Sequence, residues 1–189
     1  MKKIVIRFNA PVILTFALLS LLALLLGNWT NGATTYQYFS VYRASLSDPL
    51  TYVRFFGHVL GHADYEHYMS NMLLILLVGP GLEEKYGSGT MVWTIALTAL
   101  ITGVVHFVFF PNTVLLGASG VVFMMIVLSS FTAMRRGEIP VTLILVVIFY
   151  LGGEIMDGLF KQDSISQITH IVGGLCGLVF GFTIRRGRR

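Results

Sequence analysis

Gly117-Ala118-Ser119-Gly120 is a run of small residues that holds one serine. It follows a polar loop over 111–113 and opens an apolar segment over 121–133, which predicts a helix beginning at the serine. The N–H groups and the dipole at a helix N-terminus favour negative charge, and an attacked peptide carbonyl develops such a charge. The stretch therefore suits a catalytic serine. Small residues are also common where membrane helices pack closely, and taken alone the stretch favours that simpler interpretation.

The composition indicates an integral membrane protein. Hydrophobic residues make up 55% of the 189 positions and charged residues only 12%, whereas soluble domains carry about 25% charged residues. Apolar segments predict six membrane helices, which we place at about 11–26, 65–79, 90–110, 119–134, 140–151 and 167–184. We therefore expect an all-α fold, a bundle of six transmembrane helices formed by a single domain over 1–189.

The connections between the predicted spans carry their own signals. A long outer loop over 28–66 joins the first two spans, and its aromatic residues are typical of the membrane–water interface, so we expect short interfacial helices there. Gly79-Pro80-Gly81 predicts the end of the second span, since proline interrupts a helix. A signal peptide is the alternative for the first span, but Gly27-Asn28-Trp29 is a poor cleavage site.

The basic residues indicate an orientation. Six spans place both termini on one side, and ten of the 13 basic residues then fall on that side: Lys2, Lys3, Arg7, Lys85, Arg135, Arg136, Arg185, Arg186, Arg188 and Arg189. This asymmetry predicts cytoplasmic termini. It also argues for topology signals rather than a nucleic-acid-binding surface, so no nucleic-acid partner is expected. The short basic tails favour a bacterial inner membrane.

The predicted topology brings distant polar residues to similar depth. The second, fourth and sixth spans run in the same direction, and His67, Ser119 and His170 lie near their outer ends. A 16-residue fourth span is about 24 Å long, which is shorter than a hydrocarbon core of about 30 Å. Ser119 is therefore expected below the outer surface, and irregular backbone at that depth needs protein or a water-filled cavity around it.

His170 is the candidate base for Ser119. It precedes Gly173, Gly177 and Gly181, which recur every four residues and form a small-residue stripe on one helix face. If the fourth span packs on this stripe, the imidazole can reach the serine hydroxyl. A histidine that only forms hydrogen bonds between helices is the alternative, although polar groups inside membranes are costly enough to favour function.

His67 and Asn71 are four residues apart and share a helix face, so both could donate to an oxyanion together with the Ser119 N–H. Asn71 could instead only satisfy backbone groups. A zinc site at His58, His62 and His67 is less favoured because no HExxH motif is present, and a structural role is expected for the first two histidines. Acidic residues lie at span ends or in loops, so the sequence predicts neither a Ser–His–Asp triad nor an aspartyl mechanism.

Four motifs together resemble the rhomboid family of intramembrane serine proteases over residues 50–185. They are Arg54-x3-His58-x3-His62-x4-His67-x3-Asn71, then Gly79-x-Gly81-x-Glu83, then Gly117-Ala118-Ser119-Gly120, then His170-x2-Gly173-x3-Gly177. The resemblance implies a six-helix core, a Ser–His dyad and cleavage of transmembrane substrates without a cofactor or metal.

The resemblance also implies roles for single residues. Ser119 would be the nucleophile and His170 the base, while His67, Asn71 and the backbone at Ala118 and Ser119 would hold the oxyanion. Structural support would come from seven further residues: Gly117, Gly120, Phe123, Arg54, Glu83, Gly173 and Gly177. Three positions depart from the family pattern, namely Val53 in place of a tryptophan, Phe123 in place of a common tyrosine, and Pro80.

The sequence thus favours a serine endopeptidase that cleaves transmembrane proteins near the outer membrane boundary. Its expected partners are those substrates and the lipid bilayer. An inactive rhomboid-like protein that binds membrane clients is the first alternative, but this chain keeps both the serine and the histidine. A small transporter is the second, and it leaves the serine beside a distant histidine on a glycine face unexplained.

Overall fold

The computed structural model describes residues 8–132, 139–151 and 164–184. Within these ranges the chain is mostly helical, which confirms the all-α class, and its only bridge is the isolated antiparallel pair Val41 and Leu115. The long helices are α1 (Pro11–Trp29), α4 (Tyr65–Tyr86), α5 (Ser88–Phe109), α6 (Ser119–Ser129) and α9 (Ser164–Thr183). A short helix α7 (Val141–Val146) runs into a π-helical turn, Val147–Leu151.

Two of the described helices, α1 and α5, are long and apolar enough to cross a membrane. α6 and the segment Gln167–Thr183 of α9 are apolar but shorter. Leucines on α1 are exposed at Leu18, Leu22 and Leu25, as expected for a helix whose outer face meets lipid. These helices agree with the predicted transmembrane segments, and the count of six spans stays a prediction.

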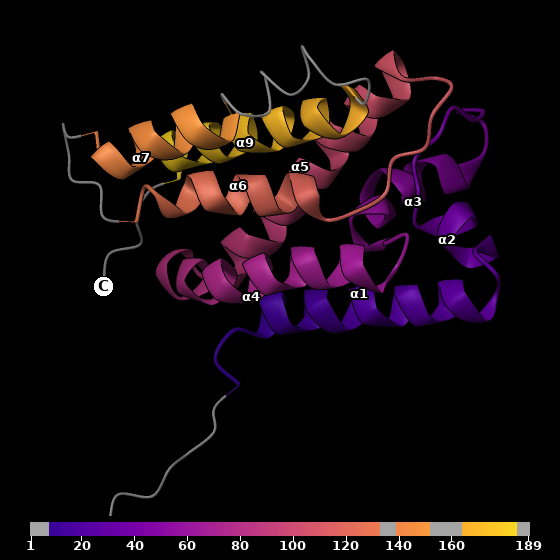
Figure 1. The fold of residues 1–189 in the computed structure, drawn as a ribbon, viewed down its shortest axis with the longest axis horizontal. Coiled ribbons are helices and arrows are strands. Elements are labelled where there is room, and N and C mark those ends of the chain that lie inside the picture. The colour runs from indigo at the N-terminus through magenta and orange to yellow at the C-terminus, as the bar shows by residue number, and fades with distance from the viewer. Residues whose placement is uncertain (1–7, 133–138, 152–163, 185–189) are drawn as a thin grey trace, which may run out of the picture.

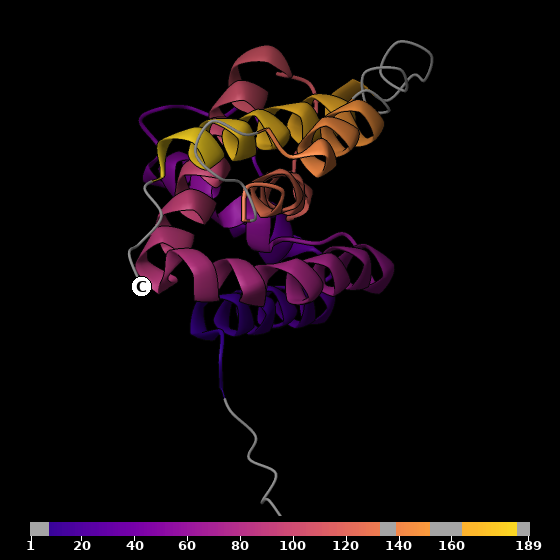
Figure 2. The ribbon, with the colours of Figure 1, turned by 90° about the vertical axis from the view of Figure 1, so that its left-hand side faces the viewer.

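The central helix of the bundle is α6. In Figures 1 and 2 it lies between α4 and α9, while α1 packs on the far side of α4. Its segment Val121 to Leu128 is apolar on every face, and such a helix is stable only when it is surrounded by others. Accordingly, every residue from Val121 to Leu128 except Phe123 is buried. The helix that begins with Ser119 is therefore fixed by the core itself.

Short helices fill the connection between α1 and α4, as predicted: α2 (Ala33–Tyr38), α3 (Pro49–Gly57) and the 3-10 turn η1 (His58–Leu60). Arg54 of α3 organises them. Its buried guanidinium donates to the carbonyl of Gln37 (2.9 Å) and to the carboxylate of Asp48 (3.1 Å), and it lies 4.6 Å from the ring centroid of Tyr42. Val53, beside it, is half exposed.

The prediction that α4 ends at Gly79-Pro80-Gly81 is wrong, since the helix continues to Tyr86 with Pro80 inside it. Tertiary contacts on both sides of the proline explain this. Gly79 lies against Ile13 of α1, closely enough that a Cβ would come within 2.7 Å of its Cδ1. The buried carboxylate of Glu83 accepts the N–H groups of Val12 and Ile13, each at 3.1 Å. These contacts offset the hydrogen bond that proline cannot donate.

Glu83 also joins three helices at this end of the bundle. By accepting two N–H groups at the start of α1 it satisfies donors that have no partner within that helix. Its Oε1 accepts the hydroxyl of Ser88, the first residue of α5, at 2.7 Å. The carboxylate therefore ties the end of α4 to the beginnings of α1 and α5.

Two further helix boundaries differ from their prediction. α6 ends at Ser129 instead of Met134, because the last N–H groups form i→i−3 bonds and the Ser129 and Thr132 hydroxyls bond back to Ile126 and Ser129 carbonyls. The described part of α9 begins at Ser164, three residues before the predicted start at 167, so His170 lies in its second turn. The connection between the predicted fifth and sixth spans, which carries Glu154, Asp157, Lys161 and Asp163, lies outside the described residues, as do most basic residues used for orientation.

Candidate active site

Ser119 is the first residue of α6, and the loop before it is held in a specific shape. Gly117 has a φ of +123°, a conformation that residues with side chains rarely adopt. Its N–H donates to the carbonyl of His58 in η1 at 2.9 Å. Two residues earlier, Leu115 forms the two-way backbone bridge with Val41, with both N···O distances at 2.8 Å. The residues just before Ser119, 115–118, which we call the serine loop, are thus held by backbone hydrogen bonds to two parts of the connection between α1 and α4.

His170 faces the first turn of α6. Its imidazole stacks on Phe123 with ring centroids 4.3 Å apart and an interplanar angle of 8°. Phe123 is four residues after Ser119, so the two share a face of α6. The structure therefore brings the predicted base to the face that carries the predicted nucleophile. The aromatic ring can orient the imidazole by stacking, although it offers no hydrogen bond.

Glycines allow α9 to approach α6 along the predicted stripe. A Cβ at Gly173 would collide with the carbonyl oxygen of Gly120, and one at Gly177 would lie 2.5 Å from the carbonyl oxygen of Met124. Further along, Gly181 packs on the ring of Phe131. The neighbour of the stripe is therefore α6, which the sequence left open. The tightest crossing, Gly120 with Gly173, lies next to Ser119.

His67 and Asn71 reach the serine loop from α4. A Cβ at Gly117 would lie 2.8 Å from the Nε2 of His67 and 4.0 Å from the Nδ2 of Asn71. The Asn71 amide donates to the carbonyl of His67 at 3.1 Å, which leaves a second N–H on that nitrogen. Three helices therefore contribute polar groups around Ser119.

His58 and His62 belong to the support of the site. The Nε2–H of His58 donates to the carbonyl of Ala99 in α5 (3.0 Å), and the buried ring of His62 lies edge-on to that of His67 with centroids 5.1 Å apart. Burial lowers the pKa of each to about 4, helped at His62 by the charge of His67, so both are neutral at pH 7. Within the described ranges no cluster of three possible metal ligands occurs.

Several residues that support the site were not identified from the sequence. Thr102 of α5 and Thr169 of α9 pack on Gly120, with methyl carbons 3.2 and 3.3 Å from a Cβ placed there. Asp64 accepts the N–H of His67 at 2.7 Å and so caps the N-terminus of α4. Asp64 could have been found from its position three residues before His67, because aspartate is a preferred N-cap.

Comparison with known proteins identifies the family of the chain. The family described as "Rhomboid domain" matches residues 49–187. The chain is 31% identical over 144 residues to Rhomboid-related protein 1 of Caenorhabditis elegans, a match that covers 69% of this chain and 39% of that protein. It is 27% identical over 173 residues to Rhomboid-related protein 2 of Mus musculus, covering 78% and 56% respectively. The chain spans less than two thirds of the length of either relative. Both relatives are animal proteins, and a bacterial origin stays a prediction. The fold, the motifs and the family match agree that the chain is an integral membrane protein of the rhomboid family.

Proposed function

We propose that this chain is an intramembrane serine endopeptidase in which Ser119 and His170 form the catalytic dyad. One observation supports it most: the Gly120–Gly173 crossing and the stack of His170 on Phe123 bring the imidazole to the Ser119 face of α6. A base beside a hydroxyl at a helix N-terminus is the arrangement that nucleophilic catalysis requires. A helix contact for packing alone does not need an imidazole there.

The chemistry follows the usual two steps of serine hydrolysis. His170 takes the proton of the Ser119 hydroxyl as the oxygen attacks the peptide carbonyl, and it then protonates the leaving amine. Water releases the acyl group by the reverse sequence. The developing oxyanion would receive N–H groups from His67, Asn71 and the backbone near Ala118 and Ser119, which lie around Gly117. Removing one side-chain donor should lower the rate while leaving residual activity, at a cost of about 2.7–4 kcal/mol.

The substrate is proposed to be a transmembrane segment. A helix in lipid keeps its carbonyls in hydrogen bonds, so it must unwind locally before Ser119 can attack it. Glycine and proline weaken a helix by about 1 and 3 kcal/mol relative to alanine, and spans with such residues near the cleavage site should be preferred. Small residues surround the serine loop, which favours a small residue before the scissile bond.

Entry from lipid is proposed between α4 and α7. α7 has only one buried residue, Leu143, and it exposes Val141, Ile144 and Leu145. It continues into a π-helical turn, a feature that is frequent at functional sites. Such a lightly packed helix can tilt at lower cost than α6 or α9. The orientation with cytoplasmic termini and an outward site remains part of this proposal, and a compartment-specific reporter fused after Arg189 tests it.

The test of the activity is covalent labelling by a fluorophosphonate probe in detergent-solubilised protein. We expect wild type to be labelled and Ser119→Ala and His170→Ala to remain unlabelled. Ser129→Ala, at the other end of α6, serves as the matched control and should be labelled like wild type. The variants that are not labelled should also fail to cleave a single-span model substrate, and the labelled ones should cleave it. A folded wild-type protein that neither reacts with the probe nor cleaves would favour the client-binding alternative.

A further inference from the structure

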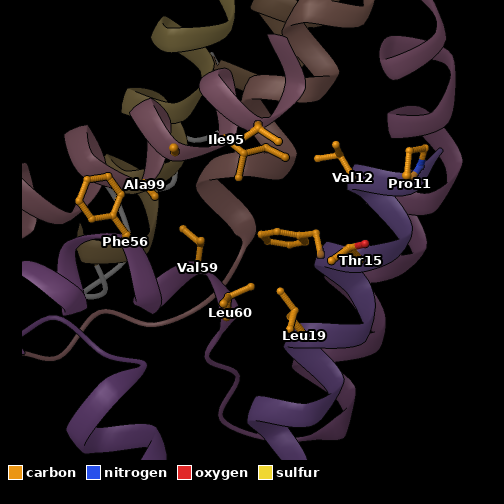
Figure 3. A pocket seen from close by; sticks show the side chains of 12 residues that line it. Pro11, Val12, Thr15, Leu19, Phe56, Val59, Leu60, Ile95 and Ala99 are labelled. Atoms are coloured by element: carbon orange, nitrogen blue, oxygen red, sulfur yellow. The ribbon is translucent and has the colours of Figure 1, made fainter. Parts of the chain in front are cut away.

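A groove of about 430 Å³ opens between α1, α5 and the end of α3 with η1, and none of its lining residues belongs to α6 or α9. Figure 3 shows its side chains pointing inward from these elements, with Leu19 on α1, Ile95 on α5 and Val59 on η1. Thr15 is the only one of its twelve lining residues with a polar side chain. The groove therefore offers almost no hydrogen bonds, and water or a polar ligand would lose its partners there.

The walls of the groove indicate what surrounds it. Its two long walls, α1 and α5, are the described helices that are long and apolar enough to cross a bilayer. The groove is continuous with their exposed surfaces, because Leu19 and Val92 line it and are themselves about half exposed. What meets this surface in a membrane is hydrocarbon. An unfilled groove would forfeit the dispersion contacts of its lining.

The length of the groove favours a single acyl chain over a protein helix. Its lining covers 11–19 of α1 and 92–99 of α5, which is about 12 Å along α1 at about 1.5 Å per residue. A transmembrane helix is about 30 Å long and about 10 Å wide, so most of it would lie outside the groove. A flexible, unbranched chain can enter lengthwise between the two walls. We propose that the groove binds one acyl chain of a membrane phospholipid.

The bound chain would lie next to the support of the serine loop. Val59 and Leu60 line the groove directly after His58, whose carbonyl accepts the Gly117 N–H at 2.9 Å. Ala99 lines it as well, and its carbonyl accepts the His58 imidazole. The lipid tail therefore packs beneath the turn that fastens the serine loop. The binding itself does not depend on the proposed protease activity.

The first test is native mass spectrometry of the full chain, taken from dioleoylphosphatidylcholine vesicles into mild detergent. We expect one lipid to stay bound to wild type. Ala96→Phe places a ring in the groove and should lose that lipid, while Val104→Phe, on the same helix outside the groove, should keep it. Equal retention by wild type and Ala96→Phe, or no retention by wild type, would overturn the proposal.

A second test identifies the occupant of the groove directly, and its main outcome is read in the protein that keeps Ala96. A benzophenone amino acid in place of Leu19 is irradiated in the same vesicles, and the adduct is identified by its mass. We expect one phospholipid adduct that Ala96→Phe suppresses. With the same group in place of the exposed Leu18 on the neighbouring face, Ala96→Phe should change nothing. Adducts from position 19 that contain protein and no lipid would assign the groove to a protein partner instead.

Discussion

Replacing Gly173 by alanine tests the crossing that brings α9 to α6. A Cβ at this position would lie 2.8 Å from the carbonyl carbon of Gly120 and still closer to its oxygen. Ordinary van der Waals contact begins at 3.4 Å, so the two backbones must separate by at least 0.6 Å. Neither side can yield by changing a rotamer, because the obstacle is main chain on both helices. Overpacking of this kind costs typically 1–3 kcal/mol.

The same displacement should affect activity more than stability. His170 lies one turn before Gly173, so a separation at the crossing moves the imidazole away from the Ser119 face of α6. Misplacement by about 1 Å can cost about 10²-fold in rate. Alanine also gains about 1 kcal/mol of helix propensity over glycine, which offsets part of the packing cost. We therefore expect a modest loss of thermal stability and a loss of fluorophosphonate labelling of at least tenfold.

The assay compares labelling rates and thermal unfolding of Gly173→Ala with those of Gly89→Ala. Gly89 lies in the first turn of α5, and a Cβ there would meet nothing within 4 Å. This control should be as stable as wild type or slightly more so, and equally reactive. Labelling of Gly173→Ala at the wild-type rate would refute the claim that this close approach sets the position of His170.

The remaining predictions concern the supports of the fold. Glu83→Gln replaces one acceptor oxygen by an amide and leaves an N–H at the start of α1 without its partner, so we expect a loss of about 1–3 kcal/mol in thermal unfolding. The exposed Glu66→Gln, which removes only a favourable charge from the first turn of α4, should cost less than about 1 kcal/mol. Arg54→Lys cannot hold both the Gln37 carbonyl and Asp48, so limited proteolysis should cut the α1–α4 connection faster, and wild-type resistance would contradict this role. Burial lowers the pKa of His62 to about 4, so the unfolded chain binds more protons than the folded chain between pH 6.5 and 4. Stability should therefore fall as the pH drops through that range. His62→Gln should reduce the slope of unfolding temperature against pH, and an unchanged slope would contradict this prediction.

The sequence by itself determined the class of the fold and the identity of the candidate residues. Apolar segments predicted α1 and α5 within three residues at each end, because hydrophobic length is a local property of the chain. Regular spacing placed His67 with Asn71 on one helix face and arranged the glycines of α9 in a stripe. Small residues around Ser119 marked the start of α6, where a helix N-terminus was expected.

Tertiary structure decided what those local patterns left open. Pro80 remains inside α4 because contacts with α1 on both sides of it offset the missing hydrogen bond, and no local signal reports such contacts. The glycine stripe could have packed on any neighbouring helix. It packs on α6 because Gly120 also lacks a side chain, so the two backbones can come into contact. Gathering Ser119, His67 and His170 in one place requires three helices to pack together, and that arrangement depends on contacts between residues far apart in the chain.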